Sequence, residues 1–161
     1  MAPLFEEKTE YYESGKIKIE SSERIMSKFD ENGQLIEEYG KRPFDFRYTA
    51  GVKFKSLYFY PNDSTTEIHH YRFNDTTMDF TIKDSSDYDE KDIFIQSPAT
   101  YIQLVFGRIR KPKKEAGSKL FVWNNHHSFK NGYLDDALFP EPIYDTDTAK
   151  IAEVIQWVRQ Q

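Results

Sequence analysis

The chain contains no cysteine, which excludes disulfide scaffolds, thiolate metal sites and cysteine nucleophiles. It also has no apolar run near the roughly 18 residues that identify a membrane-spanning helix. Its seven glycines are isolated, so the sequence has no glycine-rich phosphate-binding loop. The start, Met1–Lys8, has neither the basic segment nor the apolar run of a secretory signal peptide, so we expect a cytoplasmic protein.

Aromatic side chains, by contrast, are abundant. The 161 residues include 13 Phe, 11 Tyr and 2 Trp, which make up 16% of a chain whose hydrophobic total is only 38%. This aromatic content argues against disorder, and the composition excludes collagen-like and coiled-coil chains. The length matches one domain and no linker-like segment divides the chain, so we expect a single domain over 1–161.

Charge is distributed unevenly along the sequence. The net charge is −5, but residues 101–130 hold seven basic residues and one acidic residue and therefore carry +6. Residues 84–100 hold five acidic residues and one basic residue and carry −4. The acidic total argues against general nucleic-acid binding, and the basic run 108–119 lacks the interleaved aromatic rings that stack on bases.

Apolar and polar residues alternate with a period of two up to about residue 123, which predicts β-strands. Met78, Phe80 and Ile82, for example, alternate with polar neighbours. Turn residues such as Asn, Asp, Gly and Pro separate the alternating runs and favour hairpin connections. We therefore expect an antiparallel meander of ten short strands, at residues 8–13, 16–20, 23–29, 34–39, 52–60, 66–73, 77–83, 92–96, 101–109 and 119–123.

The last part of the chain has a helical period. Its apolar residues recur at the spacing of one helical stripe, after several N-cap candidates at 145–148. The stripe consists of Ile151, Val154, Ile155 and Val158. We expect a loop over 124–146, followed by a helix over 147–159 that packs on the sheet.

The predicted fold class is mainly β, with a β-rich region over 8–123 that forms a barrel or a strongly bent sheet, because closure removes exposed strand edges. In size and strand pattern the chain resembles a calycin-type barrel by analogy, although the N-terminal Gly-x-Trp signature of lipocalins is absent.

One segment repeats. Residues 11–17, YYESGKI, recur as residues 29–35, FDENGQL, with an aromatic residue, Ser or Asn, Gly, and Ile or Leu in the same places. This pattern resembles the hairpins of MORN-type repeat proteins. A solenoid generally needs three or more repeats, and two ordinary hairpins that each require a turn glycine are the alternative interpretation.

The aromatic strands predict a binding site for a small molecule. If Lys53 and Lys55 mark the outward face of the strand 52–60, the alternate aromatic residues point inward. Rings that surround a few polar groups are typical of a ligand cavity, although a core simply filled by rings is the alternative. The predicted ligand-binding residues are Phe54, Tyr58, Tyr60, Glu67, His69, Tyr71 and Trp123. The leading hypothesis is thus a non-catalytic β-barrel that binds a small hydrophobic or aromatic ligand inside.

A protein partner is the second hypothesis, because segregated charge on a small domain without catalytic motifs is typical of an inhibitor or immunity-type protein. The residues that would carry such a contact are Arg108, Arg110, Lys111, Lys113, Lys114, Asp87 and Asp89. The acidic run 84–92 lacks the glycine and glutamate positions of a calcium loop.

The third hypothesis is a small hydrolase or isomerase that uses His69 and a carboxylate. No Gly-x-Ser-x-Gly motif supports it, so we name no catalytic residue. The pairs His69-His70 and His126-His127 lack the spacing of known metal motifs, so we predict no metal site. The sequence leaves the cofactor and the oligomeric state unknown.

Overall fold

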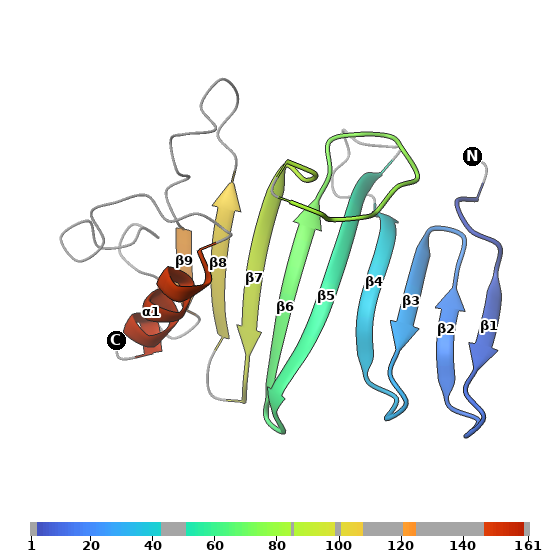
Figure 1. Cartoon of the computed structure of the whole chain (residues 1–161), viewed down its shortest axis with the longest axis horizontal. Coiled ribbons are helices and arrows are strands. Elements are labelled where there is room, and N and C mark those ends of the chain that lie inside the picture. The colour runs from blue at the N-terminus through green and yellow to red at the C-terminus, as the bar shows by residue number, and fades with distance from the viewer. Residues whose placement is uncertain are drawn as a thin grey trace.

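Nine strands follow one another across a single antiparallel sheet, so that each strand pairs with its neighbours in the sequence (Figure 1). The computed structural model describes residues 3–42, 51–84, 86–98, 101–107, 121–124 and 147–159. The elements are β1 (Lys8–Tyr11), β2 (Ile17–Ser21), β3 (Ile25–Phe29), β4 (Leu35–Arg42), β5 (Val52–Asn62), β6 (Thr65–Arg72), β7 (Glu90–Gln96), β8 (Tyr101–Gly107), β9 (Phe121–Asn124) and α1 (Thr148–Arg159).

The antiparallel meander and the C-terminal helix are confirmed, whereas the barrel is not. The sheet is open: among the described residues β1 pairs only with β2, and β9 pairs only with β8. Of the ten predicted strands, the one at 77–83 is wrong, because these residues form no strand. There the side chains of Asp75 and Asp79 accept hydrogen bonds from the amides of Thr77 and Thr81, at 3.1 and 2.9 Å, and these local turns replace a strand ladder.

The two copies of the repeated segment fold into the same hairpin turn. Gly15 and Gly33 have φ values of 89° and 87°, a region that glycine enters without steric cost. In each turn the glycine amide donates to the carbonyl three residues earlier, Tyr12 or Asp30, at 3.0 Å. The repeat therefore marks two equivalent turns, between β1 and β2 and between β3 and β4.

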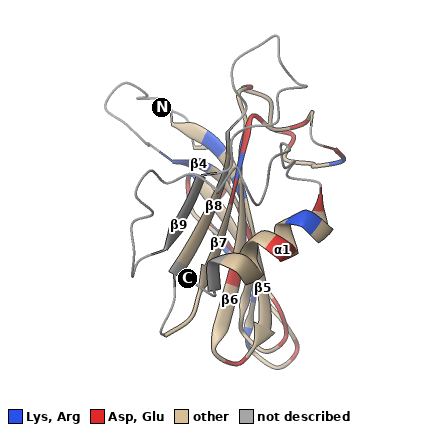
Figure 2. Ribbon diagram, turned by 90° about the vertical axis from the view of Figure 1, so that its left-hand side faces the viewer, with Lys and Arg blue, Asp and Glu red and all other residues tan. Residues whose placement is uncertain are grey.

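Helix α1 covers the C-terminal part of one sheet face, which we call the helix-bearing face (Figure 2). Asp147 caps the helix, because its side chain accepts a hydrogen bond from the Lys150 amide at 3.3 Å. Ile151 and Val154, from the predicted stripe, are buried against the sheet. The strand residues beneath them are Ile93, Ile95, Ile102, Leu104 and Phe106.

The connection between β6 and β7 crosses the same face farther toward the N-terminus (Figure 1). We call this connection, in its described residues 73–84 and 86–89, the strap. Phe73, Phe80 and Tyr88 of the strap form a buried cluster with Tyr71 of β6. The helix and the strap thus cover two separate parts of one face. No helix in the described part of the chain is both long and apolar enough to cross a membrane.

Candidate functional site

The predicted ligand-binding residues lie on two faces of the sheet rather than in one interior. Register places Glu67, His69 and Tyr71 of β6 on the helix-bearing face, in line with Ile95, Ile93 and Lys91 of β7. Phe54 and Tyr58 of β5 pair with Arg72 and Ile68, which belong to the opposite face. Because the sheet does not close, the structure does not bring the seven residues together.

Tyr71 is part of the core. Its ring is 7% exposed and meets the ring of Tyr88 edge-on, with centroids 4.8 Å apart. Tyr60 is also committed to structure, because its hydroxyl donates to the carbonyl of Leu35 at 2.7 Å. Burial raises the pKa of both Tyr58 and Tyr60 above the ordinary phenol value.

Trp123 lies in β9 opposite Gln103 of β8, and its side chain lies outside the described part. The predicted basic partner residues, between 108 and 114, also lie outside the described residues. Asp87 accepts hydrogen bonds from the amides of Lys83 and Asp84, at 2.5 and 3.0 Å, and so caps a turn of the strap. The amide of Asp89 donates to the carbonyl of Arg72 at 2.8 Å.

A row of polar residues crosses three central strands on the opposite face. Ser56, His70 and Asp92 are cross-strand partners on β5, β6 and β7. The hydroxyl oxygen of Ser56 lies 2.7 Å from Nδ1 of His70, and Arg72 donates to Asp92 Oδ2 at 2.8 Å. The ring of Phe54 stacks on the imidazole with centroids 5.6 Å apart.

Burial determines the charge state of this row. Burial, together with Arg72 and Arg42, lowers the pKa of His70 from 6.5 to about 4, so the ring is neutral at pH 7. Burial also raises the pKa of Asp92, against the effect of Arg72. Serine, histidine and aspartate are the residue types of a nucleophilic triad, but Ser56 and Asp92 are each only 3% exposed. The geometry fits two separate hydrogen-bonded pairs, Ser56–His70 and Arg72–Asp92, each of which joins two neighbouring strands.

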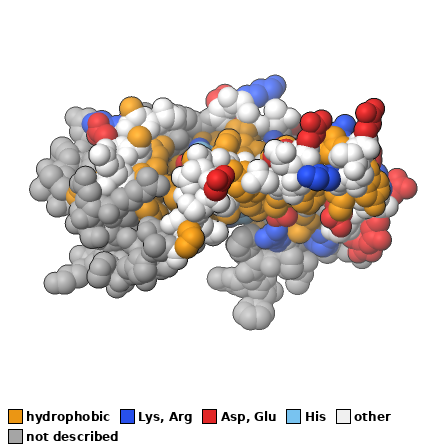
Figure 3. All heavy atoms as spheres, turned by 90° about the horizontal axis from the view of Figure 1, so that it is seen from below, with side chains coloured by type: hydrophobic (Ala, Val, Ile, Leu, Met, Phe, Trp, Pro, Cys, Tyr) orange, Lys and Arg blue, Asp and Glu red, His pale blue; other side chains and the backbone are white. Residues whose placement is uncertain are grey.

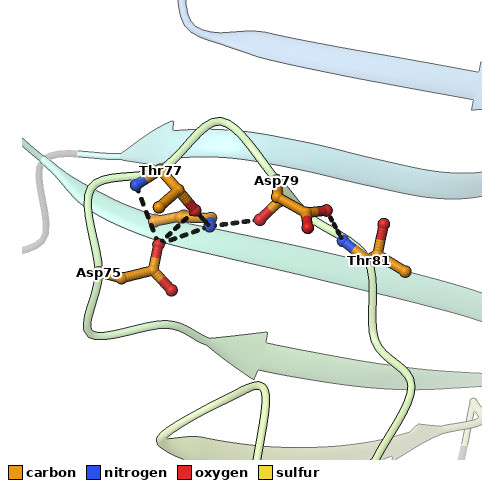
Figure 4. Close-up of polar contacts among 5 residues, drawn as sticks. Asp75, Thr77, Asp79 and Thr81 are labelled. Atoms are coloured by element: carbon orange, nitrogen blue, oxygen red, sulfur yellow. Dashed lines mark hydrogen bonds and ion pairs between the residues drawn. The ribbon is translucent and has the colours of Figure 1, made fainter.

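The predicted orientation of β5 is wrong at Lys53, whose side chain was expected to point outward but is buried. Its ammonium donates to Asp75 Oδ1 at 2.7 Å, to Thr77 Oγ1 at 3.1 Å and to the carbonyl of Asp79 (Figure 4). Lys55, predicted outward as well, is half-buried and donates to the carbonyl of Phe80 at 3.0 Å.

The ammonium of Lys53 also lies over two aromatic rings of the strap, 4.6 Å from the centroid of Phe73 and 4.9 Å from that of Phe80. These contacts replace the water that a lysine normally keeps. Its hydrogen bond also lowers the pKa of Asp75. The pair Asn74-Asp75 favours a turn at the start of this segment, but no local feature of the sequence indicates a lysine beneath it.

Four residues of β5 and β6 lie on the helix-bearing face outside the two buried clusters, with one of them, Leu57, packed against the edge of the strap cluster. Leu57 pairs with His69, and Phe59 pairs with Glu67, so all four occupy the helix-bearing face. We call Leu57, Phe59, Glu67 and His69 the open strip. Seen from the end of the sheet that carries the β5–β6 turn, hydrophobic side chains form a band bordered by charged ones (Figure 3).

The open strip combines an exposed ring with partly exposed polar groups. Phe59 is 45% exposed and meets the ring of His69 edge-on, with centroids 4.9 Å apart. Nε2 of His69 lies 3.2 Å from a carboxylate oxygen of Glu67, and their side chains are 21% and 28% exposed. Two of the predicted ligand-binding residues, Glu67 and His69, are therefore adjacent. Phe59 was missed because it was not assigned to the inward face.

In the described part of the chain, no group of three or more His, Asp or Glu side chains is arranged to hold a metal ion. Comparisons with protein-family models, curated proteins and solved structures found no match to this chain. The candidate site therefore rests on geometry alone.

Proposed function

We propose that the protein is a non-catalytic binding domain whose open strip binds a small aromatic or hydrophobic molecule that carries a hydrogen-bond donor. The observation that carries this proposal is the exposure of Phe59 beside the Glu67–His69 pair, 3.2 Å apart, on a face of which α1 and the strap cover neighbouring parts. Aromatic surface with a few convergent polar groups is typical of ligand sites.

Each member of the strip supports a different part of ligand recognition. The exposed ring of Phe59 offers a surface for stacking, which contributes about 0.5–1.5 kcal/mol beyond the area buried. The carboxylate of Glu67 accepts a hydrogen bond and favours a cationic donor over an anionic one. Leu57, half-buried against the strap cluster, provides an apolar floor. A planar ring with an amine group meets all three requirements.

A pair of related probes tests this proposal. Tryptamine and indole-3-acetate share one ring but carry opposite charges, so Glu67 favours the first. In titrations followed by amide NMR shifts, we expect tryptamine to move resonances of β5 and β6 near the strip and to bind more tightly than indole-3-acetate. Glu67→Gln should weaken tryptamine binding about tenfold, equivalent to about 1.4 kcal/mol. Phe59→Ala should weaken binding of both probes.

Met78 provides a matched control because it lies on the strap, is 52% exposed and is not part of the open strip. Met78→Ala should leave the titration unchanged. Shifts that do not concentrate at the strip, or equal binding of both probes in the wild type and in Glu67→Gln, would contradict the proposed site.

A further inference from the structure

Strand β1 forms one edge of the open sheet and presents backbone groups away from its partner. The amides of Lys8 and Tyr12 point toward β2. The Lys8 amide donates to Ser21 Oγ at 3.2 Å, and the Tyr12 amide donates to the carbonyl of Lys16 at 2.8 Å. Successive residues of a strand alternate their hydrogen-bonding direction. Thr9 therefore directs its N–H and C=O outward, where a further strand can pair with them.

The charges of β1 are complementary to a second copy of β1 in one register. Lys8 and Glu10 lie on the same face, where their charged groups are 3.4 Å apart within one chain, and their side chains are 49% and 46% exposed and so remain accessible to a second copy. In an antiparallel pair centred on Thr9, Lys8 of each copy stands opposite Glu10 of the other. Two ion pairs then form across a two-fold axis, which is the self-complementary contact that a symmetric dimer requires.

We infer that β1 is a self-association edge, at which two copies of the chain join by antiparallel β1–β1 pairing centred on Thr9. The resulting assembly is one continuous sheet with each copy's α1 at an outer end, because β1 and β9 are opposite edges of the sheet. Tyr11, 62% exposed and the most exposed large hydrophobic side chain described, lies beside this contact. The pairing is independent of the open strip.

This contact is small. Stable interfaces bury about 1,200–2,000 Å² in total, and a four-residue strand such as β1 provides only part of that area. We therefore expect an association in the high micromolar range or weaker, with exchange between single and paired copies. A covalent trap is the appropriate first experiment.

The absence of cysteine makes that trap specific. In Thr9→Cys the two new thiols face each other across the axis with Cα atoms about 5.5 Å apart, within disulfide range. In the control Tyr11→Cys the two thiols are offset by four residues, about 13 Å. Under mild oxidation we expect a disulfide-linked dimer from Thr9→Cys on a non-reducing gel and only background from Tyr11→Cys. Equal yields, or no dimer from Thr9→Cys, would overturn the proposed register.

Charge exchange provides an independent test in solution. By sedimentation equilibrium, Lys8→Glu and Glu10→Lys should each weaken self-association about tenfold or more, because like charges then oppose each other. The double variant Lys8→Glu/Glu10→Lys restores both ion pairs and should associate like the wild type. An equimolar mixture of the two single variants should form the mixed pair. A wild type that stays monomeric at millimolar concentration, or a double variant as weak as the single ones, refutes the inference.

Discussion

The ammonium group of Lys53 fastens the strap to β5 through three oxygen acceptors and two aromatic rings. Lys53→Met keeps most of the side-chain volume but removes the charge and its donors. We expect it to lower the free energy of unfolding by about 2–3 kcal/mol, because hydrogen bonds to charged groups contribute about 1.5–3 kcal/mol and the carbonyl of Asp79 loses its donor. Urea unfolding followed by circular dichroism measures the change.

Lys28→Met is the matched control for that experiment. The Lys28 side chain is 39% exposed and its ammonium lies 3.4 Å from Glu37, an arrangement that contributes at most about 1 kcal/mol. Similar losses in the two variants would mean that the buried position of Lys53 carries no special stabilisation.

His70 makes stability depend on pH. Its pKa is about 4 in the folded protein and 6.5 without the surrounding structure. As the pH falls below 6.5, His70 binds a proton in the unfolded chain before it does so in the folded protein. The free energy of unfolding therefore decreases between pH 6.5 and about pH 4. A shift of this size corresponds to a loss of about 3 kcal/mol. Urea midpoints at pH 7, 6, 5 and 4 measure it, and His70→Asn should flatten the decline.

Asp92 changes the pH dependence of stability in the direction opposite to that of His70. Because burial raises its pKa, the folded protein takes up this proton before the unfolded chain does, and acidification stabilises the fold through Asp92. Asp92→Asn should therefore steepen the acid loss that His70 causes. If His70→Asn kept the wild-type slope, another group would control the acid sensitivity.

At the level of elements, the turns and the helix were predicted correctly because they depend on residues close together in the sequence. The turns at Gly15 and Gly33 follow from residue types that tolerate positive φ, and α1 follows from a stripe that includes Ile151 and Val154. The segment 77–83 has the alternation of a strand, and its Phe80 is buried as the pattern suggests. Its backbone amides, however, donate to Asp side chains instead of to a neighbouring strand. The segment therefore lies across the face of the sheet, where Phe80 packs against residues of other strands.

Strand β5 shows why the candidate site was only partly predictable. The period of two correctly separated Phe54 from Lys53 and Lys55, but it cannot say which face another segment covers. Both faces of β5 are buried in part: the strap, some twenty residues along the chain, covers Lys53 on one face, and Phe54 is buried on the other. Glu67 and His69 were recognised from their side-chain chemistry, whereas the exposure of Phe59 depends on where α1 and the strap end.

At the scale of the whole molecule, barrel closure was the least predictable property. Closing a sheet depends on the summed twist and stagger of every strand, which no single strand encodes. Exposed strand edges are a liability, and closure into a barrel would remove them. The open sheet instead carries a charged edge at β1, with Lys8 and Glu10 at its surface.

The open sheet also predicts uneven stability along its width. Among the described side chains of β2 and β3 only Ser21 is buried, whereas β7 buries four, Lys91, Asp92, Ile93 and Ile95. Amides in both regions are bonded within the sheet, so the difference lies in the apolar cover that must open. We expect β2 and β3 amides to exchange hydrogen about a hundredfold faster than those of β7, which corresponds to about 2–3 kcal/mol in opening free energy.

Hydrogen-exchange mass spectrometry at micromolar concentration, corrected for intrinsic rates, measures this ratio. Uniform protection from β2 to β7 would instead mean that the whole sheet opens as one cooperative unit and that α1 and the strap stabilise strands they do not touch.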